Sequence, residues 1–140
     1  MCGIVAVTGY KKALPLLLNG LEKLEYRGYD SAGIAIINSE TKNISCKKAE
    51  GKLKNLINIL NDKKITGTVG IGHTRWATHG KPGVKNAHPH TDSSGNIAVV
   101  QNGIIENFQD LKNKLEEEGI IFNSDTDTEV IPHLIQRELN

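Results

Sequence analysis

Aromatic side chains, cysteines and an excess of either charge are all scarce in this sequence. Of its 140 residues, 4% are aromatic and two are cysteines, and 17 basic residues are balanced by 16 acidic ones for a net charge of +1. Nucleic-acid binding requires a basic surface, so this composition excludes it as the expected function. A small neutral or zwitterionic ligand fits better, and we expect no cofactor.

The cysteine spacing and the hydropathy pattern indicate the compartment. Cys2 and Cys46 lack C-x-x-C spacing, and the sequence has neither a signal-peptide pattern nor a long apolar run. We therefore expect a cytoplasmic protein with reduced thiols and no membrane partner. The chain is long enough for one domain with a buried core, and it contains no phosphate-binding loop of the G-x-x-x-x-G-K-[ST] type.

Apolar runs and apolar periodicity predict alternating strands and helices. Apolar runs predict strands at 3–8, 33–38, 44–48, 68–73, 97–100 and 120–122, the second and third forming a hairpin. Helical spacing predicts a helix with Pro15 in its first turn that reaches residue 24, then helices over 53–60 and from 108 to Gly119. Thr126 and Glu129 have capping-box spacing ahead of a last helix. Residues 81–95 are expected to form a loop.

Cys2 follows the initiator Met1, so removal of Met1 would make it the N-terminal residue. A free α-amine titrates near ~7.7–8.0 and can act as the general base for its own thiol, which a lysine near ~10.4 cannot do at neutral pH. Retained Met1 would convert that amine into an amide. The alternative is that Cys2 is a small apolar residue opening a strand.

Two further segments place polar side chains at strand ends. Arg75 could bind a carboxylate through its planar fork or form a structural ion pair, and Trp76 could line a cleft or the core. Asn102 and Gly103 could form a tight turn or an oxyanion hole made of a side-chain amide and a backbone N–H. Asp125 and Asp127 flank the start of the last helix, where one of them is expected to cap the helix, although a carboxylate there could instead hold a ligand ammonium.

The histidines predict no metal site. His79, His88 and His90 lie in a loop without the i, i+4 spacing of a helical zinc site. His133 is expected to be a partly buried or surface residue of the last helix, and Cys46 a packed strand residue.

Six motifs, taken together and in order, resemble one family. They are CGIV at 2–5, YRGYDSAG at 26–33, HTRWATHG at 73–80, NAHPH at 86–90, NGIIEN at 102–107 and SDTDTE at 124–129. The sequence is similar over nearly its whole length to the N-terminal glutaminase domain of the glutamine:fructose-6-phosphate amidotransferase (isomerizing) family. The second, third and sixth motifs distinguish this branch from related N-terminal-cysteine amidotransferases.

The resemblance implies an α+β fold of the N-terminal-nucleophile hydrolase type, an α/β/β/α sandwich. Residues 1–140 would form a glutaminase domain that is incomplete at its C-terminus, without the sugar-phosphate isomerase domain. In the full-length form, a homo-oligomer is expected. Glutamine would be hydrolysed to glutamate and ammonia, and the ammonia transferred to fructose 6-phosphate to form glucosamine 6-phosphate.

The resemblance also implies residue roles. Cys2 would attack the glutamine amide to form a thioester, with its own amine as base, and Asn102 and Gly103 would form the oxyanion hole. Arg75 would bind the substrate carboxylate and Asp127 its ammonium. Thr78 and His79 would line the pocket, and Trp76 would help to gate ammonia transfer.

The sequence departs from the family pattern before Asn102, where the family often has His and this chain has Gln101. We expect this change to affect supporting hydrogen bonds rather than the chemistry. Two alternatives stay open: a non-catalytic glutamine-binding or assembly fragment, and the glutaminase domain of a related amidotransferase with another acceptor.

Overall fold

The computed structural model describes residues 1–61, 63–76 and 80–140. Ten main elements follow one another within these ranges: β1 (Gly3–Val7), α1 (Ala13–Leu24), β2 (Ser31–Ile37), β3 (Ile44–Glu50), α2 (Leu53–Leu60), β4 (Val69–Arg75), β5 (His90–Thr91), β6 (Ala98–Val99), α3 (Phe108–Glu117) and α4 (Val130–Leu139). Single 3₁₀ turns lie at Glu25–Arg27, Val84–Asn86 and Asp127–Glu129.

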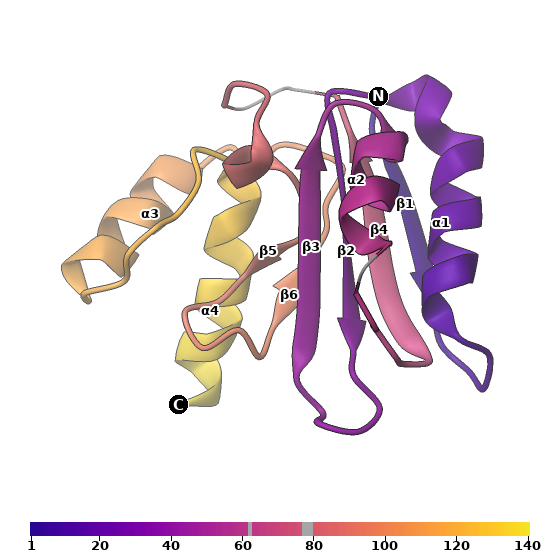
Figure 1. The fold of residues 1–140 in the computed structure, drawn as a ribbon. Coiled ribbons are helices and arrows are strands. Elements are labelled where there is room, and N and C mark those ends of the chain that lie inside the picture. The colour runs from indigo at the N-terminus through magenta and orange to yellow at the C-terminus, as the bar shows by residue number, and fades with distance from the viewer. Residues whose placement is uncertain (62, 77–79) are drawn as a thin grey trace.

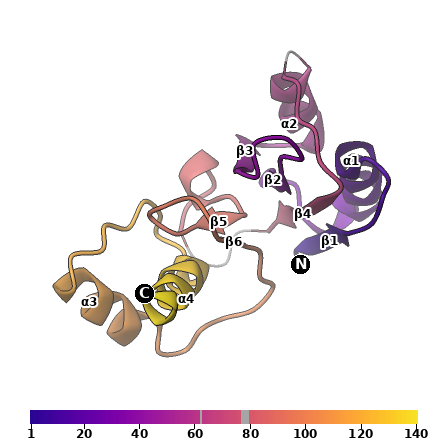
Figure 2. The same cartoon turned by 90° about the horizontal axis from the view of Figure 1, so that it is seen from below.

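The strands form two sheets between helical layers. The larger sheet is antiparallel throughout, with the order β1-β4-β2-β3, and β5 and β6 form a short antiparallel pair. Seen from below, α1 and α2 lie on one side of the larger sheet, while β5 and β6 followed by α4 and α3 lie on the other (Figure 2). The expected α+β class, with α/β/β/α layering, is confirmed.

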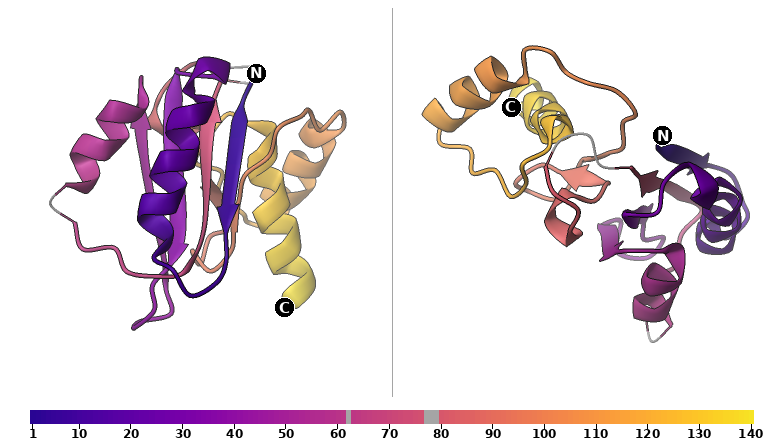
Figure 3. Two further views of the ribbon diagram at one scale, coloured as in Figure 1. Left: turned by 90° about the vertical axis from the view of Figure 1, so that its right-hand side faces the viewer. Right: turned by 90° about the horizontal axis from the view of Figure 1, so that it is seen from above.

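The packing of α1 on the larger sheet depends on glycines in β4. Leu17 and Leu21 are completely buried on α1, the helix that lies along the sheet in Figure 3. A Cβ on Gly70 or Gly72 would lie 2.9–3.0 Å from these leucine side chains, so glycine allows the helix to pack closely on the strand. Each fully buried leucine contributes about 1.5–3 kcal/mol through removal of apolar surface from water.

The opposite face of the larger sheet is covered by the segment that leads into β5. Gly33 on β2 has no room for a side chain, because a Cβ there would lie 2.0 Å from the carbonyl oxygen of His88. The two layers therefore meet backbone to backbone at this point. Strand alternation places His73 and Arg75 of β4 on this same face, since Gly72 and Thr74 face α1.

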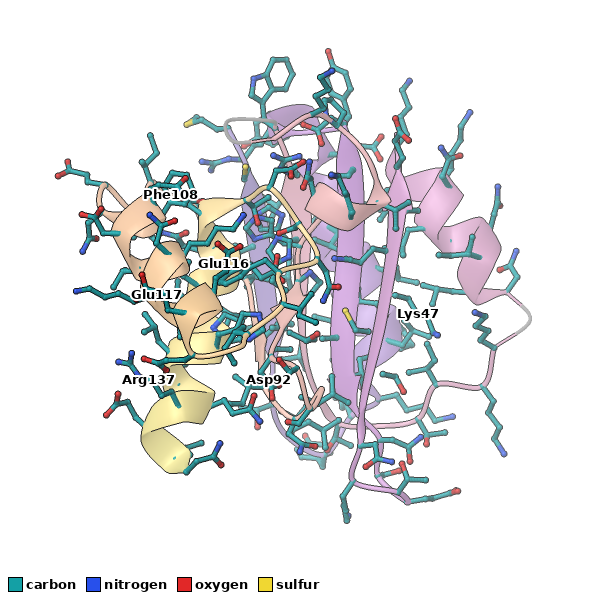
Figure 4. All side chains as sticks on the ribbon, turned by 90° about the vertical axis from the view of Figure 1, so that its left-hand side faces the viewer. Lys47, Asp92, Phe108, Glu116, Glu117 and Arg137 are labelled. Atoms are coloured by element: carbon teal, nitrogen blue, oxygen red, sulfur yellow. The ribbon has the colours of Figure 1, made fainter. Side chains whose placement is uncertain are left out.

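The outer helical layer carries many charged side chains. Glu116 and Glu117 on α3 and Arg137 on α4 are labelled in Figure 4, which views the molecule from that side. The Arg137 guanidinium lies 3.4 Å from the carboxylate of Glu118, directly after α3, and 2.9 Å from that of Glu138. These ion pairs are exposed, so we expect them to contribute at most about 1 kcal/mol each.

Most of the predicted elements are present, including the hairpin of β2 and β3. The helix predicted from 108 to Gly119 is α3, which ends two residues earlier, at Glu117. The predicted strand over 120–122 is wrong. The Ile120 N–H bonds to the Leu115 carbonyl as part of a helix-ending turn, and Ile121 is 78% exposed. The strand predicted over 97–100 is confined to β6, and β4 runs two residues further than predicted, to Arg75.

The predicted capping box before α4 is also wrong. The Glu129 carboxylate accepts the N–H groups of Asn123 and Ser124, at 2.8 and 2.7 Å, rather than the N–H of Thr126. The Thr126 hydroxyl is instead 2.7 Å from Nε2 of His90. Although burial raises the pKa of Glu129, its hydrogen bonds hold that pKa at about 2. The carboxylate thus fixes the turn that precedes α4.

Candidate active site

The start of β1 and the end of β4 meet at one edge of the larger sheet, because Gly3 pairs with Thr74. The N-terminus lies at the upper edge in Figure 1. The backbone N–H of Trp76 donates to Sγ of Cys2 at 3.2 Å, and the thiol lies 3.5 Å from the Trp76 carbonyl. The sulfur is therefore held by the residue that directly follows β4.

Asn102 joins Cys2 from a distant part of the chain. Its Nδ2 donates to the backbone carbonyl of Cys2 at 3.0 Å, and its Oδ1 lies 2.9 Å from Nε2 of His73. Gly103 follows with φ of +156°, and none of the described residues accepts its backbone N–H. The Asn102 amide and the Gly103 N–H are thus brought beside residue 2.

These groups border a cavity of about 480 Å³. This volume is within the usual range for small-molecule sites. The described residues that line it are Met1, Cys2, Arg27, Arg75, Trp76, His88, Gln101, Asn102, Gly103, Ile104, Thr126, Asp127 and Thr128. The cavity therefore contains a thiol, several hydrogen-bond donors, two cations and a carboxylate.

Arg75 supplies a buried cation to the cavity. It is 2% exposed, donates to the carbonyls of Gly80 and Lys81 at 3.3 and 3.5 Å, and lies 4.0 Å from the carboxylate of Asp30. Arg75 therefore forms structural contacts, as one of its two predicted roles requires. Because it also lines the cavity, its position fits the other predicted role, which is to bind a carboxylate.

Asp127 supplies the carboxylate. It is buried, and its Oδ2 accepts the backbone N–H of Ile105 at 2.7 Å, which ties it to the segment after Gly103. The expected helix-capping role of Asp125 or Asp127 is wrong: Asp125 forms an ion pair with Lys85 at 2.8 Å, and neither carboxylate caps α4. The cavity therefore contains the carboxylate of Asp127 as well as the guanidinium of Arg75.

A group of buried histidines adjoins the cavity, and one of them, His88, lines it. The rings of His73 and His88 stack with centroids 4.1 Å apart, and His90 contacts His88 edge-on at 4.7 Å. Burial lowers the pKa of His73 to about 4 and that of His90 to about 3, and it also lowers the pKa of His88. All three rings are therefore neutral at pH 7.

Sequence reasoning missed two residues of this site. His73 shares the face of β4 with Arg75, so the period-two alternation of a strand could have indicated it. Arg27 lines the cavity from the turn after α1, and its Nε is buried with no partner among the described residues. Only the motif around it, YRGYDSAG, could have indicated Arg27.

The remaining predicted site residues are Trp76, Thr78 and His79. Trp76 is 47% exposed and contacts the ring of Tyr29 edge-on at 5.4 Å, so it lies at the rim rather than in the core. Thr78 and His79 lie outside the described residues. Within the described ranges, no group of three or more His, Cys, Asp or Glu residues could hold a metal ion. In the same ranges, no helix has the length and hydropathy needed to cross a bilayer.

Comparison with known proteins gives relatives over nearly the whole chain. The sequence is 61% identical over 136 residues to glutamine–fructose-6-phosphate aminotransferase [isomerizing] of Gloeobacter violaceus, covering 96% of this chain and 22% of that protein. It is 58% identical over 139 residues to the protein of that name from Pyrococcus horikoshii, covering 99% of this chain and 23% of the relative. The chain therefore spans about a fifth of the length of these relatives.

Solved structures agree with this similarity. One is the glutamine phosphoribosylpyrophosphate amidotransferase of B. subtilis, complexed with ADP and GMP, with 31% identity and a TM-score of 0.80 over 98% of this chain and 29% of that one. Another, described as the allosteric regulatory enzyme of purine biosynthesis, has 33% identity and a TM-score of 0.82 over 98% of this chain and 30% of that one.

The family model named glutamine amidotransferase domain matches residues 58–138, which is more than half of the chain. This match covers Arg75, Asn102, Gly103 and Asp127. With the fold and the relatives in agreement, the chain belongs to the glutamine amidotransferase domain family.

Proposed function

We propose that this chain hydrolyses the side-chain amide of L-glutamine, with Cys2 as the nucleophile after removal of Met1. One observation carries the proposal: the Cys2 thiol and the Asn102–Gly103 donors, which are 100 residues apart in sequence, meet at one cavity. A nucleophile beside two fixed donors is the arrangement that acyl transfer requires. The family name and the relatives support the same chemistry.

The reaction follows from these positions. The Cys2 sulfur attacks the amide carbon, and its proton passes to the α-amine that removal of Met1 exposes. Nδ2 of Asn102 and the N–H of Gly103 stabilise the negative charge on the carbonyl oxygen. The C–N bond then breaks, and ammonia leaves with the proton. Water attacks the resulting thioester, which releases glutamate and restores the thiol.

The charges in the cavity suit the two ends of a free amino acid. We assign the substrate α-carboxylate to Arg75, whose planar guanidinium can bind it through two hydrogen bonds. We assign the α-ammonium to Asp127, one oxygen of which is already fixed by the Ile105 N–H. Thr78 and His79 would complete the pocket, and Trp76, at the rim, would help to direct the ammonia.

The acceptor comes from the relatives alone. Because they are named glutamine–fructose-6-phosphate aminotransferases, we propose that the ammonia aminates fructose 6-phosphate within a longer, homo-oligomeric protein. Residues 1–140 would then act as its glutaminase domain, located in the cytoplasm and requiring neither a cofactor nor a metal.

Mass spectrometry tests the covalent step and the processing of Met1 together. The purified protein is incubated with a diazoketone analogue of glutamine, and its intact mass is measured before and after. We expect loss of Met1 and one adduct on Cys2, which Cys2→Ala abolishes and Cys46→Ser retains. Cys46 is a suitable control because burial raises the pKa of its thiol.

Glutamate release, measured on the same samples, separates the alternatives. Hydrolysis by Cys2→Ala at the wild-type rate would contradict the proposed nucleophile. Glutamine binding by the processed protein without adduct or glutamate release would favour the non-catalytic binding fragment. Glutamine hydrolysis without amination of fructose 6-phosphate by the longer protein would favour a related amidotransferase with another acceptor.

A further inference from the structure

We propose that His73 is a positioning residue, which holds the Asn102 amide so that its NH₂ group, rather than its oxygen, faces the reacting carbonyl. This inference rests on the proposed function and adds a residue to it. Its basis is the contact between Nε2 of His73 and Oδ1 of Asn102 at 2.9 Å.

Hydrogen-bond pairing fixes which imidazole nitrogen carries the proton. Nε2 of His73 lies 2.9 Å from Oδ1 of Asn102 and 3.3 Å from the carbonyl oxygen of Gln101. Both neighbours accept hydrogen bonds, so Nε2 must be the protonated nitrogen. On the other side of the amide, Nδ2 of Asn102 donates to the Cys2 carbonyl at 3.0 Å. Exchange of the amide oxygen and nitrogen would destroy both contacts.

The surroundings of the ring keep it neutral, with a single donor. Nδ1 of His73 is buried and has no partner among the described residues, so a proton there would lack an acceptor. The ring of His88 covers one side at a centroid distance of 4.1 Å, and the Arg75 cation disfavours a further positive charge. Burial lowers the pKa of His73 to about 4. The donor at Nε2 therefore persists throughout the neutral pH range.

This orientation affects the rate of the reaction. An asparagine amide that can rotate presents its oxygen to the developing oxyanion part of the time. The partial negative charge of the amide oxygen then repels the negative charge of the oxyanion. Loss of one oxyanion-hole donor typically lowers kcat about 10²–10³-fold. Gly103 needs no such support, because its donor belongs to the backbone.

Two substitutions at position 73 separate the hydrogen bond from the packing. His73→Phe keeps a flat ring against His88 but removes the donor, whereas His73→Gln keeps an N–H near the position of Nε2. For glutamine hydrolysis, we expect His73→Phe to lower kcat about 10- to 10³-fold while KM changes less than about threefold. His73→Gln should restore kcat to within about tenfold of the wild type.

Alkylation of Cys2 by iodoacetamide provides a matched readout, since that displacement at carbon develops no oxyanion. We expect His73→Phe to leave the alkylation rate within about twofold of the wild type. A wild-type kcat in His73→Phe would overturn the proposal, and so would kcat and the alkylation rate falling together. Combining His73→Phe with Asn102→Ala should lower kcat no further than Asn102→Ala alone.

Nitrogen NMR of the wild-type protein tests the proposal independently of turnover. In uniformly ¹⁵N-labelled protein, Nε2 of His73 should be protonated and Nδ1 unprotonated at pH 7, and His73→Gln should shift the side-chain amide signals of Asn102. A proton on Nδ1 would overturn the inference even if glutamine is hydrolysed. If the wild type fails to hydrolyse glutamine while this tautomer is found, the proposed function fails and the orientation of Asn102 stands.

Discussion

The buried histidines should make the fold sensitive to mild acid, well above the pH at which carboxylates are protonated. Burial lowers the pKa of His73 from 6.5 to about 4 and that of His90 to about 3. A histidine with a lowered pKa stays neutral in the folded state and, below pH 6.5, takes up a proton on unfolding. Its stabilising contribution is therefore present above pH 6.5 and is lost as the pH falls from 6.5 towards the folded pKa.

The size of this loss of stability follows from the difference between the test pH and the pKa of the unfolded histidine. At pH 5.0, the unfolded histidine lies 1.5 pH units below its pKa of 6.5 while the folded histidine is still neutral. At 1.36 kcal/mol per unit, each of the two histidines costs about 2 kcal/mol of unfolding free energy relative to pH 7.5. Urea unfolding at these two pH values measures the difference directly. The carboxylate of Glu129, with a pKa of about 2, adds its loss only below about pH 4.5.

A substitution at one histidine tests the assignment. His90→Gln keeps a polar side chain beside Thr126 but cannot titrate, so the loss of stability between pH 7.5 and 5.0 should shrink by about 2 kcal/mol. Thr126→Ser is the control: it changes the same contact, which spans 2.7 Å in the wild type, without removing a titratable group, and its pH difference should equal that of the wild type. An unchanged pH difference in His90→Gln would refute the reasoning.

Three further predictions follow from packing and charge. Gly33→Ala should destabilise the fold by about 1–3 kcal/mol or more in urea unfolding, since its Cβ would lie 2.0 Å from the His88 carbonyl; wild-type stability would show that the layers can separate there. Leu21→Ala should cost about 2–5 kcal/mol, against less than about 0.5 kcal/mol for the exposed Ile121→Ala, and equal losses would contradict the assigned core. Arg75→Lys should raise KM for glutamine at least about tenfold with a smaller change in kcat, because the two-point contact is lost; an unaltered KM would remove Arg75 from carboxylate binding.

Local sequence pattern was sufficient for most of the elements. The stripe containing Leu17 and Leu21 predicted α1 because residues three and four apart share a helix face. The hairpin of β2 and β3 was predictable because two apolar runs flank a short polar connection. Gly119 marked the end of α3 because it adopts a positive φ of 90°, which glycine tolerates best.

The errors come from backbone groups whose partners are distant or unexpected. The apolar residues 120–122 resemble a strand, yet the Ile120 N–H completes the α3 turn, and the N–H groups of Asn123 and Ser124 bond to the Glu129 carboxylate. Thr126 and Glu129 have the spacing of a capping box, but each side chain is used by a different neighbour. Sequence spacing alone does not determine which of several nearby acceptors forms a hydrogen bond with a buried N–H.

The site required more than pattern. Cys2 lies at the end of β4 because β1 pairs with that strand, and Asn102 reaches the same point through its contact with His73 of β4. Sequence periodicity carries no information about either the strand order or this contact. The resemblance supplied both residues before the structure showed their contact. The role proposed for His73 needed atomic positions, because it depends on which nitrogen faces which acceptor.

Gln101 shows how the structure supports a residue that departs from the family pattern. Its backbone carbonyl lies 3.3 Å from Nε2 of His73, and its N–H donates to Nδ1 of His88 at 3.4 Å, so the two histidines hold its main chain. Its side chain is held separately, since Oε1 accepts the hydroxyl of Thr128 at 2.8 Å. The backbone that aims Asn102 and Gly103 is therefore fixed by groups that do not depend on the side chain at position 101. A side-chain amide also keeps its acceptor at every pH, whereas a histidine there would change its hydrogen bonding on protonation. The contact between position 101 and Thr128 is thus made by groups that do not titrate, which fits the expectation that Gln101 affects supporting hydrogen bonds rather than the proposed chemistry.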